Sequence, residues 1–350
     1  MTNHTKAHTN AQTKAPGMPD DTLLRVRDLA VDFRVARGPW PWQKSQLHAV
    51  NGISFDVRRG ETLGLVGESG CGKSTLARAV IGLSPVASGS VTWQGEETVF
   101  GTQRRLGALR RGVQMIFQDP LASLDPRMSI GEIVAEPLRT HAPHLGRKEI
   151  ARRVLTMLER VGLNARHLER RAHEFSGGQC QRVGIARALV GEPALVICDE
   201  PVSALDVSIQ AQIVNLLRDL QRDLALSLLF VGHDLAVVKT LSHRVMVMYL
   251  GRVMELGTRQ AVYDAPAHPY TRALLDAVPV ADPARERHAS LLRGEIPSPL
   301  NPPSGCAFRT RCPKASTQCA AAAPEPAAIG LGGSIVACWH PRAADDSIAA

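Results

Sequence analysis

Nine consecutive residues, 67–75, have the composition of a loop that wraps around a phosphate chain. They read Gly-Glu-Ser-Gly-Cys-Gly-Lys-Ser-Thr, follow the apolar run 63–66 and precede a run with helical composition, 76–80. Glycines in such a strand–loop–helix unit let backbone N–H groups approach phosphate oxygens, and the helix N-terminus adds positive potential. Lys73 would reach the terminal phosphates, and the Ser74 hydroxyl would bind Mg²⁺. The phosphate-binding residues that this loop predicts are Gly67, Ser69, Gly70, Gly72, Lys73, Ser74 and Thr75.

Two adjacent carboxylates, Asp199 and Glu200, end an apolar run that starts at Leu195. An acid at the carboxyl end of a buried strand, beside a phosphate-binding loop, holds the Mg²⁺ that accompanies a nucleotide. Asp199 fits this role, so Asp199 and Ser74 are predicted metal ligands. Glu200 lies one residue further on, where it would polarise a water molecule.

A second segment rich in small residues, 176–179, precedes the helical run 180–189. Small residues at a helix start again favour an anion-binding site, because backbone N–H groups and the helix dipole point at the ligand. Two phosphate-binding helix starts in one chain are more than one nucleotide needs. The pattern therefore favours two chains that share each nucleotide.

These residues carry a resemblance to a known family. Residues 175–179, Phe-Ser-Gly-Gly-Gln, are similar to the LSGGQ signature of ATP-binding cassette (ABC) ATPases, with Phe in the first position. Gln118 resembles the family's Q-loop glutamine, residues 203–206 resemble its D-loop, and His233 resembles its switch histidine. The resemblance covers about residues 23–340, with every motif in the family's order.

The resemblance implies an α/β fold: a P-loop NTPase core with a RecA-like sheet and an antiparallel β subdomain, an inserted α-helical signature lobe and a small Cys-containing C-terminal segment. It also implies that Glu200 is the general base and that His233 holds the γ-phosphate. Gln118 would join Ser74 and Asp199 as a Mg²⁺ ligand and link the site to membrane subunits. The residues expected to act on a nucleotide of the partner chain are Ser176, Gly177, Gly178 and Gln179 of the signature, with Asp206 of the D-loop.

A closer match exists within the family. Segments 118–128, 136–138, 268–271 and 305–313 resemble the ATPase subunits of oligopeptide/dipeptide importers. The Asp-Pro-Arg-Met stretch in the first segment favours the F-type of the two paired ATPases. Nickel and glutathione importers share much of this pattern and remain alternatives for the imported solute.

The implied partners are two membrane permease subunits, a second ATPase (a D-type subunit or a second copy) and, indirectly, an extracytoplasmic solute-binding protein. The expected location is peripheral, on the cytoplasmic face of the inner membrane. A soluble ABC ATPase of cluster assembly or translation is the alternative from another class, and an exporter subunit is a third. Capture of membrane permeases would separate these functions.

Composition supports a protein without membrane spans of its own. The chain has 350 residues, 44% hydrophobic and 21% charged, with a formal net charge of +8. No stretch approaches the roughly 18–20 apolar residues of a transmembrane helix. Residues 1–20 are polar and lack the apolar core of a signal peptide, so we expect a disordered leader. The basic residues come without a nucleic-acid-binding motif, so no nucleic acid partner is expected.

Periodicity predicts the elements that position these residues. Strands are expected at 26–35 and 47–57, helices at 147–161 and 208–222, and a hairpin over 245–256. Ser129 and Glu132 form an S-x-x-E capping box that predicts a helix start.

One aromatic residue near the first strand is expected to stack on adenine, as the resemblance implies. Phe33 occupies the favoured position, with Trp40 and Trp42 as alternatives in the following loop. The alternation of the strand allows Phe33 to be a core residue instead.

The composition shifts after about residue 281 towards Pro, Ala, Gly and Cys. We expect an ATPase domain at 21–280, with the helical lobe at about 125–190, a C-terminal segment at 281–342 and a disordered tail at 343–350. Clustered cysteines in a reducing compartment favour a metal over disulfides. The resemblance implies a [4Fe–4S] cluster, with zinc and reduced thiols as alternatives. The candidate ligands are Cys306, Cys312, Cys319 and Cys338.

Overall fold

The computed structural model describes residues 21–36, 44–98, 103–278, 294–329 and 333–342. The expected leader, 1–20, and the expected disordered tail, 343–350, lie outside the described residues. Trp40 and Trp42, the alternative stacking residues, also lie outside them.

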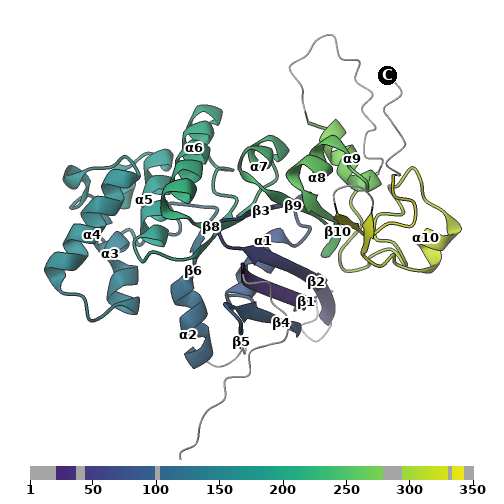
Figure 1. Cartoon of the computed structure of the whole chain (residues 1–350), viewed down its shortest axis with the longest axis horizontal. Helices are drawn as coiled ribbons and strands as arrows, with labels where there is room; N and C mark the ends of the chain where they lie inside the picture. Colours follow the sequence, from purple (N-terminus) through teal and green to yellow (C-terminus); the bar gives the residue numbers. More distant parts are fainter. Residues whose placement is uncertain (1–20, 37–43, 99–102, 279–293, 330–332, 343–350) are drawn as a thin grey trace, which may run out of the picture.

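A large mixed sheet runs through the middle of the molecule (Figure 1). Five of its strands are parallel, and three antiparallel strands extend one edge. Three parallel strands are buried along their whole length, as expected for strands covered on both faces. In sheet order, the described strands are β6 (Val113–Ile116), β7 (Leu195–Asp199), β8 (Ser227–Val231), β3 (Thr62–Val66), β9 (Arg244–Tyr249), β10 (Arg252–Thr258), β12 (Ser334–Val336) and β11 (Ala327–Ile329).

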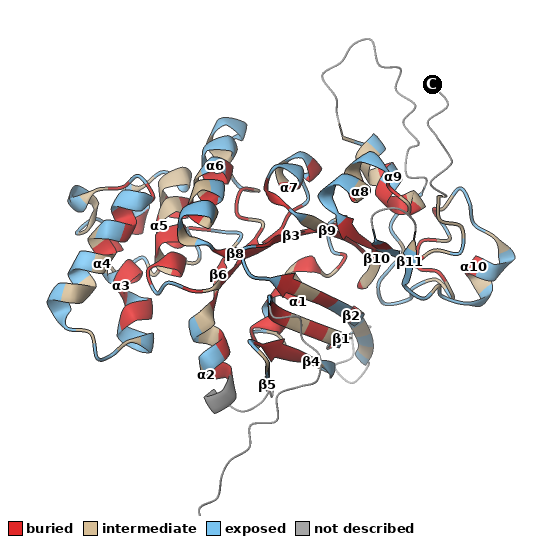
Figure 2. Ribbon diagram, viewed as in Figure 1, coloured by how far each residue is buried: buried red, intermediate tan, exposed pale blue. Residues whose placement is uncertain are grey.

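A smaller antiparallel sheet covers one face of the large sheet. Helix α1 (Lys73–Val80) packs in the same hydrophobic cluster as this sheet, and α2 (Gln103–Gly112) leads back into β6. Figure 2 shows buried residues concentrated where the layers meet. The strands of the small sheet, in sheet order, are β2 (Lys44–Arg58), β1 (Thr22–Ala36), β4 (Ser88–Trp93) and β5 (Glu96–Thr98).

Three helices form a lobe at one end of the molecule: α3 (Ile130–His141), α4 (Arg147–Arg160) and α5 (Gly177–Leu189). The predicted capping box is present, because Ser129 accepts from the backbone N–H of Glu132 and Glu132 accepts from that of Ser129. Two 3₁₀ helices, Ala165–His167 and Ala172–Glu174, connect α4 to α5.

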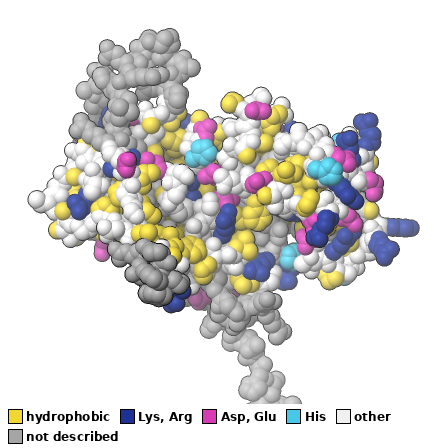
Figure 3. Space-filling view, turned by 180° about the vertical axis from the view of Figure 1, so that it is seen from behind, with side chains coloured by type: hydrophobic (Ala, Val, Ile, Leu, Met, Phe, Trp, Pro, Cys, Tyr) yellow, Lys and Arg dark blue, Asp and Glu magenta, His cyan; other side chains and the backbone are white. Residues whose placement is uncertain are grey.

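Charged side chains gather on this lobe, at the right of Figure 3. Arg152 and Arg153 both pair with Glu149, and Arg170 pairs with Glu174. These three arginines of the lobe therefore have neighbouring carboxylates that balance their charge. The other face of the large sheet is covered by α6 (Val207–Leu224), α7 (Leu235–Leu241), α8 (Arg259–Asp264) and α9 (Pro269–Asp276).

The C-terminal segment lies at the opposite end of the molecule from the lobe (Figure 1). Strand β12 pairs with β10, and Phe308 is buried in the same hydrophobic cluster as helices of the core. Helix α10 (Thr317–Ala321) buries Cys319. The segment thus shares a sheet and a core with the rest of the chain. Within the described residues, no helix has both the length and the apolar character to cross a bilayer.

The strand and helix predictions are confirmed at 26–35, 47–57, 147–161 and 208–222, with ends that differ by a few residues. The predicted hairpin is β9 and β10. Because parallel strands end at the same edge of a sheet, the segments that follow β3, β6, β7 and β8 meet in one place.

Candidate active site

The phosphate-binding loop joins β3 to α1. Gly72 has φ of 102°, and a Cβ atom there would overlap the carbonyl oxygen of Ala49. Glycine is therefore required for the loop to lie against the small sheet. Lys73 is buried, and its Nζ donates to the carbonyl oxygens of Gly67 (2.8 Å) and Glu68 (3.1 Å). The lysine is held inside the curve of its own loop.

Asp199, at the end of β7, lies against the first turn of α1. The Ser74 hydroxyl donates to Asp199 Oδ1 at 2.6 Å, and Arg78 Nη2 donates to Oδ2 at 3.3 Å. The carboxylate is fully buried, so these bonds compensate its removal from water. A hydroxyl and a carboxylate oxygen are the ligand types that Mg²⁺ takes beside a phosphate chain, so the pair fits that ion. Sequence reasoning missed Arg78, although it lies one helical turn after Ser74.

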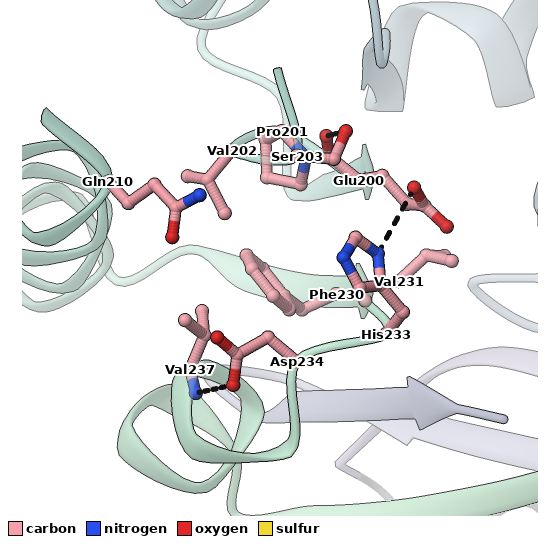
Figure 4. Close-up of a pocket in the computed structure, with 11 residues that line it drawn as sticks. Glu200, Pro201, Val202, Ser203, Gln210, Phe230, Val231, His233, Asp234 and Val237 are labelled. Carbon is pink, nitrogen blue, oxygen red and sulfur yellow. Dashed lines mark hydrogen bonds and ion pairs between the residues drawn. The ribbon is translucent and has the colours of Figure 1, made fainter. Parts of the chain in front are cut away.

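Two side chains that follow the neighbouring strands β6 and β8 contact the carboxylate of Glu200. Gln118 Nε2, after β6, donates to Glu200 Oε2 at 3.0 Å, and His233 Nδ1, after β8, lies 3.4 Å from the same oxygen. Figure 4 shows His233 and Glu200 facing each other across the ends of their strands. Glu200 also has φ of 46°, a conformation uncommon outside glycine. Such strain often occurs at functional sites, and here it is held by a backbone bond from Glu200 to Val231.

A cavity of about 290 Å³ opens beside these groups. Phe33, the favoured stacking residue, lines it from β1, and Pro299 of the C-terminal segment lines it as well. Its other lining residues come from the small sheet, the loop and the strand ends: Leu47, His48, Ala49, Ser69, Gly70, Gly72, Lys73, Ser74, Thr75, Gln118, Glu200, Leu250 and Gly251.

A smaller cavity, about 40 Å³, lies behind Glu200 (Figure 4). Gln210 of α6 and Asp234 border it, and Asp234 caps α7 by accepting from the backbone N–H groups of Ala236 and Val237. This cavity is too small for a nucleotide, so the larger one is the candidate binding site.

The signature residues do not line either of these cavities. Ser176 is the N-cap of α5: its Oγ accepts from the backbone N–H of Gln179, and Gln179 Oε1 accepts from that of Ser176 at 3.0 Å. The S-x-x-Q spacing is a capping-box signal that sequence reasoning missed. Asp206 is exposed at the start of α6. The start of α5 is thus a capped helix start that lines neither cavity.

Sequence reasoning also missed a set of contacts to the loop from the C-terminal part of the chain. Arg311 forms two hydrogen bonds with the carboxylate of Glu68, and the Tyr270 hydroxyl accepts from the Glu68 backbone N–H. Both residues lie in segments singled out above, 268–271 and 305–313, but nothing in their sequence indicates this target.

The four candidate cysteines of the C-terminal segment lie near one another. The backbone N–H of Cys306 donates to the Cys319 carbonyl at 2.8 Å. Burial raises the pKa of the Cys312 thiol, and raises that of Cys338 to about 11, with a further increase in each from the other thiols. No disulfide joins them, and among the described residues no group of His, Cys, Asp or Glu is arranged to hold a metal ion.

Two family models match this chain. The ABC transporter model matches residues 50–203, and the model for the C-terminal region of oligopeptide/dipeptide transporters matches residues 254–319. The oligopeptide transport ATP-binding protein OppF of Escherichia coli K12 is 59% identical over 86% of this chain and 92% of its own length. The protein of the same name from Haemophilus influenzae is 55% identical over 87% of this chain and 93% of its own length.

Solved structures give the same fold. A dimeric ATP-binding cassette in a post-hydrolysis state, bound to ADP and phosphate, has a TM-score of 0.60 and 25% identity, and covers 68% of this chain and 99% of its own. The Clostridium perfringens protein cbiO1, described as part of the ABC transporter complex cbiONQ, has a TM-score of 0.60 and 30% identity. That match covers 70% of this chain and 92% of its own.

Proposed function

This chain belongs to the ABC transporter family, among the oligopeptide-transport ATP-binding proteins, and we propose that it binds MgATP in the 290 Å³ cavity and hydrolyses it to drive peptide import. The observation that carries this proposal is that Lys73, Ser74 and Glu200 line that cavity, with Asp199 hydrogen-bonded to the Ser74 hydroxyl. Phosphoryl transfer needs positioning and charge stabilisation rather than covalent catalysis, and these residue types supply both.

The residues around the cavity would have separate roles in binding and hydrolysis. Backbone N–H groups of the loop and Lys73 would hold the phosphates, with Phe33 against adenine. Ser74 and Asp199 would hold Mg²⁺, with Gln118 proposed as a third ligand, and the bound ion would supply positive charge to the phosphate oxygens. Glu200 would accept a proton from the attacking water.

Two neighbours support Glu200 in this role. Gln118 and His233 both contact its Oε2, and this fixes the direction in which the carboxylate points. A positioned base contributes about 10²–10⁴-fold to such a reaction. We propose that His233 also holds the γ-phosphate, as its exposed position beside Glu200 allows.

We propose further that each nucleotide is shared between two cassettes. Ser176, Gly177, Gly178 and Gln179 lie at a capped helix start away from the cavity of their own chain, so they are available to a nucleotide on a partner. The related post-hydrolysis cassette is itself described as a dimer. Asp206, exposed nearby on α6, would lie at the same contact.

The relatives and the C-terminal family model support di- or oligopeptides as the imported solute. The chain would then act with membrane permeases, as a peripheral subunit on the cytoplasmic face of the inner membrane. We propose two permeases, a D-type ATPase or a second copy as the partner cassette, and a solute-binding protein outside. In this scheme residues 21–280 form the ATPase domain, including the lobe at about 125–190, and 281–342 form the C-terminal segment.

The four tail cysteines carry a separate proposal. We infer that Cys306, Cys312, Cys319 and Cys338 hold a [4Fe–4S] cluster, which takes four thiolates, although their sulfur atoms are not arranged as a metal site among the described residues. What supports it is their proximity: the backbone N–H of Cys306 donates to the Cys319 carbonyl, and the charges of nearby thiols add to the effect of burial in raising the pKa of Cys312 and Cys338. Anaerobically purified protein should be brown, and Cys312→Ser should remove the colour. Colourless protein without iron would contradict the cluster.

Binding and hydrolysis of MgATP by the purified full chain test the proposed catalytic function. Lys73→Ala should weaken MgATP binding strongly, because it removes the buried charge from the loop. Lys148→Ala, an exposed lysine of α4, is the matched control and should bind as the wild type does. Equal MgATP affinity in both variants would show that Lys73 does not hold the phosphates. It would also contradict nucleotide binding in this cavity. ATP-dependent uptake of labelled peptide by cells with and without the chain tests the solute, with nickel and glutathione as competing substrates.

A further inference from the structure

One residue of the phosphate-binding loop, Glu68, is held from the far end of the sequence. Arg311 Nη1 donates to Glu68 Oε2 at 2.6 Å and Arg311 Nη2 donates to Oε1 at 3.0 Å. The arginine side chain is only 5% exposed, and that of the glutamate 21%. Two parallel charge-assisted bonds in a mostly buried setting fix direction as well as distance.

The other polar groups of Glu68 are also engaged. Its backbone N–H donates to the Tyr270 hydroxyl at 3.0 Å, and its carbonyl oxygen accepts from Lys73 Nζ at 3.1 Å. The C-terminal part of the chain therefore holds the carboxylate and the backbone N–H of Glu68, whereas Lys73 contacts its carbonyl oxygen. Any displacement of Glu68 would move an acceptor of Lys73.

A rigid aromatic group supports this contact. Tyr249, Tyr270 and Phe308 are fully buried, with ring centroids 4.8–5.4 Å apart. Arg311 lies over the Tyr249 ring at 5.8 Å, a cation–π distance. Because the arginine has little freedom to rotate, the direction of its bonds is set before any ligand binds. The hydrogen bonds to Glu68 also raise the pKa of Arg311, so its charge is permanent.

We propose that Arg311 is a positioning residue for the phosphate-binding loop, and that through Glu68 the C-terminal segment sets the affinity of the chain for ATP. Pro299 of the same segment lines the nucleotide cavity, so the segment also contacts that site directly. The proposal rests on the nucleotide site proposed above. It assigns to the C-terminal segment an effect in its own chain, before any partner cassette is engaged.

Equilibrium binding of a fluorescent ATP analogue to the full chain, with Mg²⁺, tests this. Arg311→Ala and Glu68→Gln should each raise the Kd about tenfold, the equivalent of losing one charged hydrogen bond. The double variant should also be about tenfold weaker rather than a hundredfold, because the two residues act as one unit. Arg311→Lys, which keeps charge but loses the fork, should fall between wild type and Arg311→Ala.

Arg309→Ala is the matched control. Arg309 lies in the same segment but donates to the Ser304 carbonyl at 2.8 Å and does not contact the loop in the structure. The Arg309→Ala variant should bind the analogue as wild type does, even if thermal unfolding shows that it loses as much stability as Arg311→Ala. Glu68→Gln keeps the proposal testable if Arg311→Ala fails to fold.

The outcomes separate two failures. Wild-type chain that does not bind the analogue would overturn the nucleotide site and this inference together. Wild-type binding with unchanged Kd in Arg311→Ala and Glu68→Gln, additive losses in the double variant, or an equal loss in Arg309→Ala would overturn the positioning role alone.

Discussion

The helical lobe and the C-terminal segment lie at opposite ends of one sheet and relate to the nucleotide site in opposite ways (Figure 1). The lobe carries the signature at a capped helix start, yet its signature residues do not line the described nucleotide cavity. The C-terminal segment carries none of the ATPase motifs, yet Arg311 contacts the phosphate-binding loop and Pro299 lines the cavity. Motif content and physical contact are therefore separate properties here.

The difference indicates what each region needs to act. Under the proposed function the N–H groups of the lobe act on a nucleotide bound by another cassette, so the contribution of the lobe would depend on a second chain. The segment acts through bonds already formed within this chain, so its contribution is present in the isolated protein. Changes at the strand ends, in the segment and in the lobe should thus affect hydrolysis, affinity and assembly separately.

The largest effect is expected from loss of the base. Glu200→Gln should lower steady-state ATP hydrolysis by at least about 10²-fold while leaving MgATP binding near normal, because the loop, Ser74 and Asp199 are unchanged. Glu159→Gln, an exposed site in the lobe, should hydrolyse normally. Phosphate release and equilibrium binding measure the two properties. Hydrolysis by Glu200→Gln near the wild-type rate would show that Glu200 is not the general base.

A pair of core variants compares the two ends directly. Phe308→Ala in the segment and Leu158→Ala in the lobe each empty a fully buried position. Each should lower the free energy of unfolding by about 3 kcal/mol. Phe308→Ala alone should also weaken ATP binding, by severalfold, because Phe308 packs against Tyr249 and Tyr270, which support Arg311 and Glu68.

Denaturant unfolding and analogue binding below the unfolding transition measure these two effects. If both variants lost affinity in proportion to stability, the segment would have no special link to the loop. If neither lost affinity, the aromatic group would serve the fold alone.

An effect confined to acidic pH concerns His268, which caps α9 beside the segment. Its Nδ1 accepts from the backbone N–H of Tyr270 at 3.0 Å, so the ring is neutral, and burial lowers its pKa to about 4. The unfolded chain takes up this proton near pH 6.5, before the folded chain does. The stability that His268 supplies is therefore present above pH 6.5 and lost as pH falls towards 4, by up to about 1.4 kcal/mol per pH unit.

Glu255 acts in the opposite sense, because burial raises its pKa and its contribution falls as pH rises above the ordinary range of a glutamate. A His268→Asn variant keeps a capping acceptor but not the titration. Unfolding free energies from pH 7 to 4.5 should fall more steeply in wild type than in this variant. If the unfolding free energies of the two proteins fell in parallel with pH, His268 would not be the source of this pH dependence.

The sequence predicted those parts of the site that follow a local pattern. Asp199 ends a buried parallel strand, His233 follows another by two residues, and Lys73 lies at the end of the loop that follows a third, so the shared edge of the sheet brings them together. Ser176 and Gln179 also form a local pattern, a capping box, which could have been found from its spacing.

The contact of Arg311 with Glu68 could not be predicted, because it joins residues 243 positions apart and no periodicity encodes it. The same holds for Pro299, which reaches the cavity from a proline-rich stretch without helix or strand. Strand β12 was likewise missed, because three residues are too few to show alternation.

The shared nucleotide is the central claim, and mixing two inactive chains tests it most directly. A Lys73→Ala chain lacks a working loop but has an intact signature, whereas a Ser176→Arg chain has the reverse. Each alone should hydrolyse ATP very slowly. An equimolar mixture should regain hydrolysis well above either parent, because the pairing of unlike chains rebuilds one complete site. A mixture no more active than the mean of its two parents would contradict a site shared between two copies of this chain.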